Sequence, residues 1–182
     1  MYRHTRRIEL GEVVVTWDLA SVEKWDFSMG NAASEANSGA ELSGKPYVDF
    51  CLESLDEDLD TSLGALLNGL PTLLVFVTSW CPDCSEAAAR CDELNSTYSG
   101  RLNVLLVSVD ATYDAALALV RAVPAGGCGT GGVDRAQRFW AKGGTTPTEY
   151  GVTYVPHRVL LSKSGIVMKN YDMEWSDVPS LI

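Results

Sequence analysis

Two predominantly apolar runs, residues 73–77 and 102–109, dominate the hydrophobic pattern of the chain. Runs of this length without alternation are typical of strands that are buried on both faces of a sheet. Apolar positions recur at helical spacing over residues 82–98 and again over residues 113–123, where Pro124 ends the pattern. The centre of the chain therefore predicts two buried strands that alternate with two helices.

Weaker patterns flank this centre. Residues 47–52 alternate like a strand, and leucines recur at helical spacing over residues 55–70. Residues 134–142 predict a short helix, and the runs 157–161 and 166–170 predict a β-hairpin around a glycine-containing turn. The resulting order β-α-β-α-β-α-β-β indicates an α/β sandwich in which a mixed central sheet is flanked by helices.

The first 45 residues form a separate region in this pattern. Residues 13–17 have the composition of one short strand, and residues 28–44 are small and polar, as in a flexible linker. We therefore expect an N-terminal extension over residues 1–45 and one folded domain over residues 46–182.

Composition narrows the classes of partner. The 182 residues carry a net charge of −10, which would repel a nucleic acid or an anionic membrane surface. No stretch approaches the roughly 20 apolar residues that a membrane-spanning helix needs, and the basic residues 3–7 are not followed by the apolar segment of a secretory signal. Five cysteines are too few for a secreted disulfide scaffold of this size. We expect a cytoplasmic monomer with no nucleic-acid or membrane partner.

The strongest chemical motif is the segment Trp80-Cys81-Pro82-Asp83-Cys84, which follows the apolar run 73–77. Two cysteines separated by two residues at a strand-to-helix junction are typical of a reversible dithiol/disulfide, because the unpaired N–H groups and the dipole of the first helical turn favour a thiolate. Pro82 suits the first helical position, where its missing N–H costs nothing. We expect Cys81 to be the nucleophile, with an exposed sulfur, and Cys84 to be the resolving thiol.

A second motif lies downstream, where Tyr150-Gly151-Val152-Thr153-Tyr154-Val155-Pro156 precedes the predicted hairpin. Together the two motifs resemble the thioredoxin superfamily over roughly residues 46–175. The resemblance implies a thioredoxin-like three-layer sandwich in which Pro156 follows a cis peptide bond and packs beside the two cysteines. The long interval between Cys84 and Pro156, and the ending Trp175-Ser176-Asp177-Val178-Pro179, are similar to tryparedoxins and nucleoredoxins.

This resemblance implies a thiol–disulfide oxidoreductase of the tryparedoxin or nucleoredoxin kind, a protein-disulfide reductase that serves redox homeostasis. Cys81 would attack a substrate disulfide and Cys84 would resolve the mixed disulfide. The implied enzyme acts on proteins that contain disulfides, and it binds no cofactor and no metal. Its electrons would come from an external reductant such as thioredoxin reductase, glutathione or trypanothione. The predicted substrate contacts are Trp80, Pro82, Val155 and Pro156.

Two other functions fit the same residues. A thioredoxin fold whose cysteine pair is vestigial would act as a binding module in a larger assembly. The segment Thr78-Ser79-Trp80-Cys81 also matches the Thr-x-x-Cys of peroxiredoxins, which are thiol peroxidases that use one cysteine. A zinc site is disfavoured, since the chain has no second pair of closely spaced cysteines or histidines.

The remaining candidate residues have simpler expected roles. We expect Cys91 in the core, Cys51 on a strand without a special role, and Cys128 accessible in a glycine-rich loop. His157 stands where Thr is common in the family, and we expect it at the rim of the site. Asp83 between the cysteines is another departure from the family pattern, and such departures favour a narrow substrate range.

Overall fold

The computed structural model describes residues 5–10, 13–18, 42–122 and 136–182, in two compact units, Met1–Ser34 and Glu35–Ile182. In the first unit, β1 (Thr5–Leu10) and β2 (Val13–Asp18) pair as an antiparallel hairpin in which Leu10 lies opposite Val13. The strand predicted over residues 13–17 is confirmed, and its partner strand was not predicted. Most of the predicted linker lies outside the described residues.

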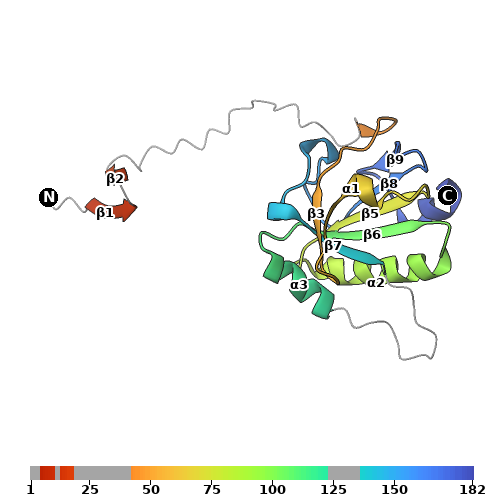
Figure 1. Ribbon diagram of the computed structural model, residues 1–182, viewed down its shortest axis with the longest axis horizontal. Helices are drawn as coiled ribbons and strands as arrows, with labels where there is room; N and C mark the ends of the chain where they lie inside the picture. Colours follow the sequence, from red (N-terminus) through yellow and green to blue (C-terminus); the bar gives the residue numbers. More distant parts are fainter. Residues whose placement is uncertain (1–4, 11–12, 19–41, 123–135) are drawn as a thin grey trace. The chain divides into compact units, whose positions relative to one another are not determined.

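The second unit is built on a seven-stranded mixed sheet in the order β4-β3-β7-β6-β5-β8-β9 (Figure 1). β5, β6 and β7 are parallel to one another, and the other neighbouring strands pair antiparallel. The strands are β3 (Cys51–Ser54), β4 (Asp60–Ser62), β5 (Thr72–Val77), β6 (Asn103–Ser108), β7 (Gln137–Ala141), β8 (His157–Leu161) and β9 (Val167–Asn170).

Two helices connect the parallel strands. α2 (Pro82–Thr97) joins β5 to β6, and α3 (Tyr113–Ala122) follows β6; both lie below the sheet in Figure 1. The short α1 (Leu63–Leu66) lies toward the other face, and α4 (Val178–Leu181) ends the chain. None of the described helices is long and apolar enough to cross a membrane.

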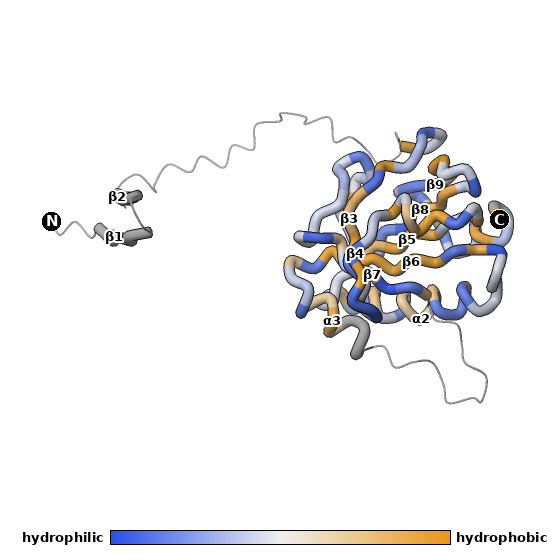
Figure 2. Tube along the Cα trace, in the orientation of Figure 1, coloured by the Kyte–Doolittle hydropathy of each residue, from blue (hydrophilic) through white to orange (hydrophobic). Residues whose placement is uncertain are grey.

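Burial on both faces explains the apolar runs of β5 and β6. Every residue of these two strands is buried, and Figure 2 shows both strands near the centre of the sheet as largely apolar. Alternate side chains enter two separate cores: Leu73, Val75 and Val77 pack in the core that contains α2, while Leu74 and Phe76 pack in the core on the opposite face. The two strands predicted from these runs are confirmed, as are the helices after them and the hairpin of β8 and β9.

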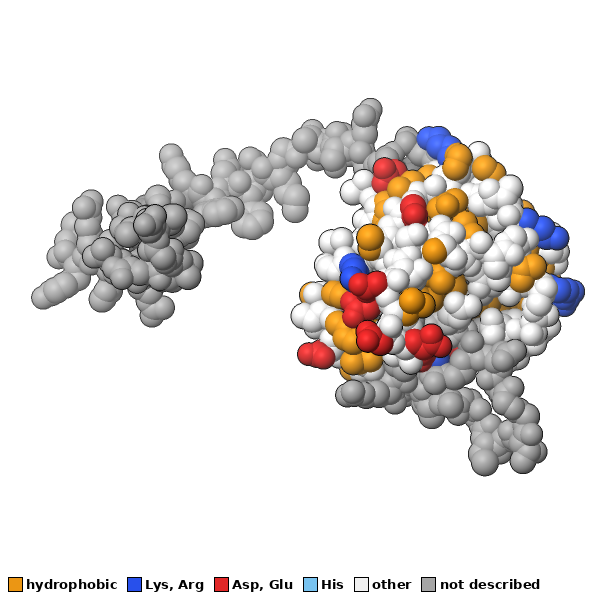
Figure 3. Space-filling view, in the orientation of Figure 1, with side chains coloured by type: hydrophobic (Ala, Val, Ile, Leu, Met, Phe, Trp, Pro, Cys, Tyr) orange, Lys and Arg blue, Asp and Glu red, His pale blue; other side chains and the backbone are white. Residues whose placement is uncertain are grey.

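The helix predicted over residues 55–70 is wrong, because only Leu63–Leu66 is helical. The side chain of Ser54 accepts hydrogen bonds from the backbone N–H groups of Asp56 and Glu57, at 3.3 and 3.1 Å, and turns the chain before a helix can begin. The segment then pairs with β3 as β4. Its carboxylates at Asp56, Glu57, Asp58 and Asp60 are exposed, and Figure 3 shows acidic side chains gathered on one part of the surface.

The helix predicted over residues 134–142 is also wrong, because Gln137–Ala141 forms β7. β7 pairs in parallel with β6 and antiparallel with β3, so backbone pairing on both sides outweighs the local helical pattern. Residues 47–52 enter the sheet later than predicted, since β3 begins at Cys51. The glycine-rich loop and Cys128 lie outside the described residues.

The cost of cavities in the sheet gives a direct test of the fold. Leu105 is fully buried at the centre of β6, and we expect Leu105→Ala to lower the free energy of unfolding by about 2–5 kcal/mol through lost burial and a residual cavity. Leu59→Ala is the matched control, because Leu59 is 46% exposed, and its effect should stay within about 0.5 kcal/mol. Urea denaturation measures both, and equal effects would contradict this placement of β6.

Candidate active site

The two cysteines lie where β5 passes into α2. Cys81 occupies the N-cap position of α2, Pro82 stands at the start of the helix, and the Cys84 backbone N–H donates to the Cys81 carbonyl at 3.2 Å. The position predicted for the motif, at a strand-to-helix junction, is thus the one observed. Pro fits there because a first-turn N–H would have no partner within the helix.

The expectation that the Cys81 sulfur is exposed is wrong. Cys81 is only 7% exposed, and Cys84 is fully buried. The segment before β8 covers the nucleophile candidate: the Cys81 thiol donates to the backbone carbonyl of Val155, with 3.6 Å between sulfur and oxygen. The peptide bond between Val155 and Pro156 is cis, as the resemblance implied, so the second sequence motif does meet the first.

Burial sets the ionisation of the second cysteine. The pKa of Cys84 is raised to about 12, chiefly by loss of solvent and by a hydrogen bond with the Cys81 side chain; the charges of Cys81 and Asp83 add to this rise, and a backbone hydrogen bond with Thr78 opposes it. Cys84 therefore holds its proton at neutral pH while the pair is reduced. The pKa of Cys91 is also raised by burial, as expected for a core thiol, whereas Cys51 is exposed.

A buried aspartate fixes the loop before the cysteines, and sequence reasoning missed it. Asp110, just past the end of β6, accepts hydrogen bonds from the Ser79 backbone N–H and hydroxyl, both at 2.9 Å, and from the Ser108 hydroxyl at 2.8 Å. Its own carbonyl accepts from Trp140 Nε1 at 2.8 Å. The sequence did offer one signal for this role, since Asp110 is a polar residue at the carboxyl end of a predicted strand parallel to β5.

His157 does not lie at the rim of the site. It is fully buried, and its Nε2 lies 2.7 Å from Asn170 Oδ1. The Asn170 amide nitrogen donates to the Tyr150 carbonyl, so its oxygen is the acceptor and His157 Nε2 carries the proton. Burial lowers the pKa of His157, and the ring is neutral in the folded protein. The prediction that His157 lies at the rim of the site is therefore wrong.

Two clefts flank the Val155–Pro156 bond. The first, of about 340 Å³, is mainly apolar, and we call it the apolar cleft; its lining includes Trp80, Val109, Val152, Tyr154 and Val155. The second, of about 590 Å³, runs along the exposed side of α2 between Pro156 and Trp175, and we call it the α2 cleft. Trp80 is 75% exposed at the edge of the first. Of the predicted contact residues, Trp80 and Val155 line the apolar cleft and Pro156 lines the α2 cleft, whereas Pro82 lines neither.

Metal ligands do not gather near these clefts. Across the described ranges, no three His, Cys, Asp or Glu side chains are grouped so that they could hold a metal ion. The chemistry that the arrangement offers is that of two adjacent thiols, of which Cys81 keeps a small exposed fraction beneath Val155 and Cys84 is fully buried.

Comparison with known proteins agrees with this architecture. Residues 56–125 match the family model described as Thioredoxin. The thiol:disulfide interchange protein TxlA of Synechococcus elongatus is 34% identical over 68 residues, which are 37% of this chain and 36% of that protein. Its homolog in Synechocystis is 41% identical over 46 residues, which are 25% and 26%. The match thus spans about a third or less of these curated relatives.

Solved structures extend the likeness over most of the chain. A thiol-disulfide oxidoreductase from Bacteroides fragilis superimposes with a TM-score of 0.59 at 20% identity, covering 76% of this chain and 100% of that one. The thioredoxin domain of a thiol-disulfide oxidoreductase from Bacteroides vulgatus gives a TM-score of 0.58 at 12% identity, covering 76% and 93%. The predicted thioredoxin-like sandwich with a mixed sheet is confirmed.

The ionisation of Cys84 predicts selective alkylation. With a pKa of about 12, only about one Cys84 thiol in ten thousand is a thiolate at pH 8, and the side chain is buried. Iodoacetamide at pH 8 should therefore modify the exposed Cys51 and leave Cys84 unmodified in the reduced folded protein, as read by peptide mass mapping. In urea both should react alike. Equal alkylation in the folded protein would refute the buried placement of Cys84.

The buried histidine predicts a pH dependence of stability. Because the pKa of His157 is lowered from 6.5 on folding, the unfolded chain binds a proton that the native protein does not, so stability is lost as pH falls below about 6.5. Urea denaturation from pH 7 to 5 should show this decline, with a slope of at most about 1.4 kcal/mol per pH unit. His157→Gln keeps a donor toward Asn170 and should flatten the curve over this range; an unchanged curve would contradict the assignment.

Proposed function

We propose that this member of the thioredoxin superfamily is a thiol–disulfide oxidoreductase that reduces disulfide bonds in proteins, with Cys81 as nucleophile and Cys84 as resolving thiol. The observation that carries the proposal is the arrangement of the two thiols at the start of α2, with Cys81 against the Val155 carbonyl and Cys84 enclosed behind it. We further propose the tryparedoxin or nucleoredoxin branch, on the sequence features named above.

The proposed reaction is two exchanges of one disulfide for another. The Cys81 thiolate attacks one sulfur of the substrate disulfide, so a mixed disulfide forms and the other substrate cysteine leaves as a thiolate. Cys84 then gives up its proton and attacks the Cys81 sulfur, the Cys81–Cys84 disulfide forms, and the second substrate cysteine leaves. The substrate gains two electrons and two protons, and an external thiol or reductase returns two electrons and two protons to the cysteine pair.

The raised pKa of Cys84 supports a working direction toward reduction of the substrate. A strong oxidant needs a stabilised reduced form, in which at least one thiolate is favoured by its surroundings. Here burial and Asp83 both disfavour a thiolate at Cys84, so Cys84 does not stabilise the reduced form in the way that a strong oxidant requires. Cys84 loses its proton after Cys81 has attacked the substrate and before Cys84 itself attacks, because the substrate thiolate released in the first exchange can accept that proton.

Substrate contact would centre on the segment before Pro156. Val155 contacts the nucleophile and lines the apolar cleft, and its backbone would pair with an extended substrate segment as an added strand. Trp80 and Tyr154, which are 75% and 42% exposed beside the apolar cleft, would cover an apolar side chain next to the substrate cysteine. We propose that the protein acts as a monomer in the cytoplasm, with an external thiol or a reductase as donor.

The test is reduction of insulin disulfides driven by dithiothreitol. The wild type should accelerate insulin precipitation, and Cys81→Ser should abolish the acceleration because the attacking sulfur is gone. Cys84→Ser should instead accumulate a mixed disulfide that nonreducing gels resolve, since the first exchange proceeds without the second. Cys51→Ser, a change at an exposed thiol outside the site, is the control and should keep full activity.

The outcome separates the proposal from its alternatives. A folded wild type with no more activity than Cys81→Ser, and with no mixed disulfide in Cys84→Ser, would overturn the proposed function and favour a binding module. Peroxide consumption that needs Cys81 but survives Cys84→Ser would favour a thiol peroxidase.

A further inference from the structure

We propose that the α2 cleft selects substrates in which the reacting cysteine is flanked by lysine or arginine on the side away from the apolar cleft. The inference rests on the proposed function and names its substrate class. The substrate is a disulfide whose reacting cysteine has an apolar residue on one side and a basic residue on the other.

The nucleophile stands between the two clefts. Trp80, the residue before Cys81, lines the apolar cleft, while Asp83, two residues after it, lines the α2 cleft. The covering segment divides in the same way, because Val155 lines the first cleft and Pro156 the second. A substrate segment that crosses Cys81 along Val155 and Pro156 therefore places residues on both sides of its cysteine into different surroundings.

The α2 cleft carries an excess of negative charge. Asp83, Glu86, Arg90 and Glu93 are all exposed and line it, and their spacing of three and four residues puts them on one side of the helix. Arg90 is ion-paired with Glu93, which cancels one carboxylate. Within the described residues no ion pair engages Asp83 or Glu86, the two carboxylates nearer to the cysteines.

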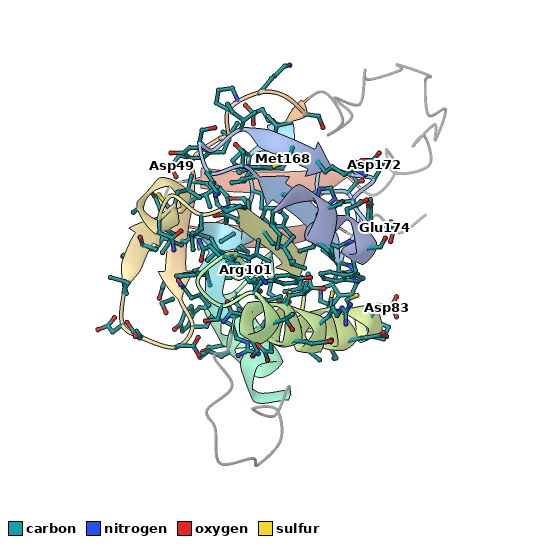
Figure 4. All side chains as sticks on the ribbon, turned by 90° about the vertical axis from the view of Figure 1, so that its right-hand side faces the viewer. Asp49, Asp83, Arg101, Met168, Asp172 and Glu174 are labelled. Carbon is teal, nitrogen blue, oxygen red and sulfur yellow. The ribbon has the colours of Figure 1, made fainter. Side chains whose placement is uncertain are left out.

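The opposite wall of the cleft does not offset this charge. It contains Trp175, and the guanidinium of Arg158 lies 5.0 Å from the centre of that ring and 3.8 Å from a carboxylate oxygen of Glu174. The guanidinium beside this wall is thus already paired with a carboxylate. Figure 4 shows Asp83, Glu174 and Asp172 on the same side of the molecule, so a substrate approaching along this side meets carboxylates from α2 and from the segment after β9.

Size also fits a long side chain. The α2 cleft has about 590 Å³, within the range of clefts that hold small ligands, and is larger than the apolar cleft. An extended lysine or arginine side chain can lie along Ala87 and Ala89 with its charge near Glu86, because long basic side chains pack their methylene groups on apolar surface and keep the charge in water. Aspartate or glutamate in the same place would face like charges.

The test compares two peptides that share one disulfide and one apolar flanking residue, and that differ only in lysine against glutamate on the other flank of the cysteine. Each enzymatic rate is divided by the rate with dithiothreitol alone, which removes the intrinsic effect of charge on the disulfide. The wild type should give a kcat/KM roughly threefold to tenfold higher for the lysine peptide at low salt, and the ratio should approach one in about 0.5 M salt. Because the proposed preference depends on the side of the cysteine, a peptide with lysine on the side that faces the apolar cleft should be reduced no faster than its glutamate counterpart.

Two charge reversals assign the preference to the cleft. Glu86→Lys should remove or invert the ratio without abolishing reduction of the glutamate peptide. Glu57→Lys is the matched control, because Glu57 is equally exposed and lies in the turn between β3 and β4, so it changes the net charge by the same amount and should keep the wild-type ratio.

The outcomes are distinguishable. Equal corrected rates for the two peptides, or a preference that Glu86→Lys leaves unchanged, would overturn the inference and leave the proposed function standing. A wild type that reduces neither peptide faster than Cys81→Ser does would overturn both.

Discussion

Burial of β5 on both faces, with a hydrogen-bonded strand on each side, is the constraint on which the site depends. The strand pairs with β6 in parallel and with β8 antiparallel, and none of its six residues is exposed. Its register places Val77 opposite Ser108 and Phe76 opposite His157. The carboxyl end of β5 therefore meets the end of β6 and the start of β8. The cysteine pair, the Asp110 anchor and Pro156 come together because two adjacent strands end and a third begins at this edge.

Polar groups inside this framework act as ties between elements. Arg138 of β7 is buried and forms a 2.9 Å ion pair with Asp92 of α2, and the other carboxylate oxygen of Asp92 accepts the Ala136 backbone N–H at 3.0 Å. A buried pair of this kind contributes little net stability, because both charges lose their water. Its effect is positional: it joins the middle of α2 to the start of β7, which keeps the helix that carries the cysteines at a fixed place beneath the sheet.

The sequence was most informative where local signals and long-range packing agree. The apolar runs of β5 and β6, and the helix beginning at Pro82, needed only burial and the fit of proline to a first turn. The helices predicted for the leucines before β5 and for the residues of β7 were wrong. The Ser54 turn outweighed helical periodicity in the first segment, and strand pairing outweighed it in the second. Asp110 and the burial of His157 depend on partners 31 and 13 residues away, and no spacing within the motif reveals those partners.

The Asp83 carboxylate affects both the cysteine pair and the surface around it. Asp83 adds to the raised pKa of Cys84, after burial and Cys81, and it also begins the acidic side of α2. An acidic residue there is favoured by the helix dipole, so it stabilises the helix start while it shapes the field outside. Since Cys84 is shielded by burial and Glu86 lies farther along the exposed surface, the outer charges act chiefly on what approaches Cys81. The two proposals therefore rest on different parts of the site: the proposed reduction rests on the buried thiol, and the proposed substrate selection rests on the exposed side of α2.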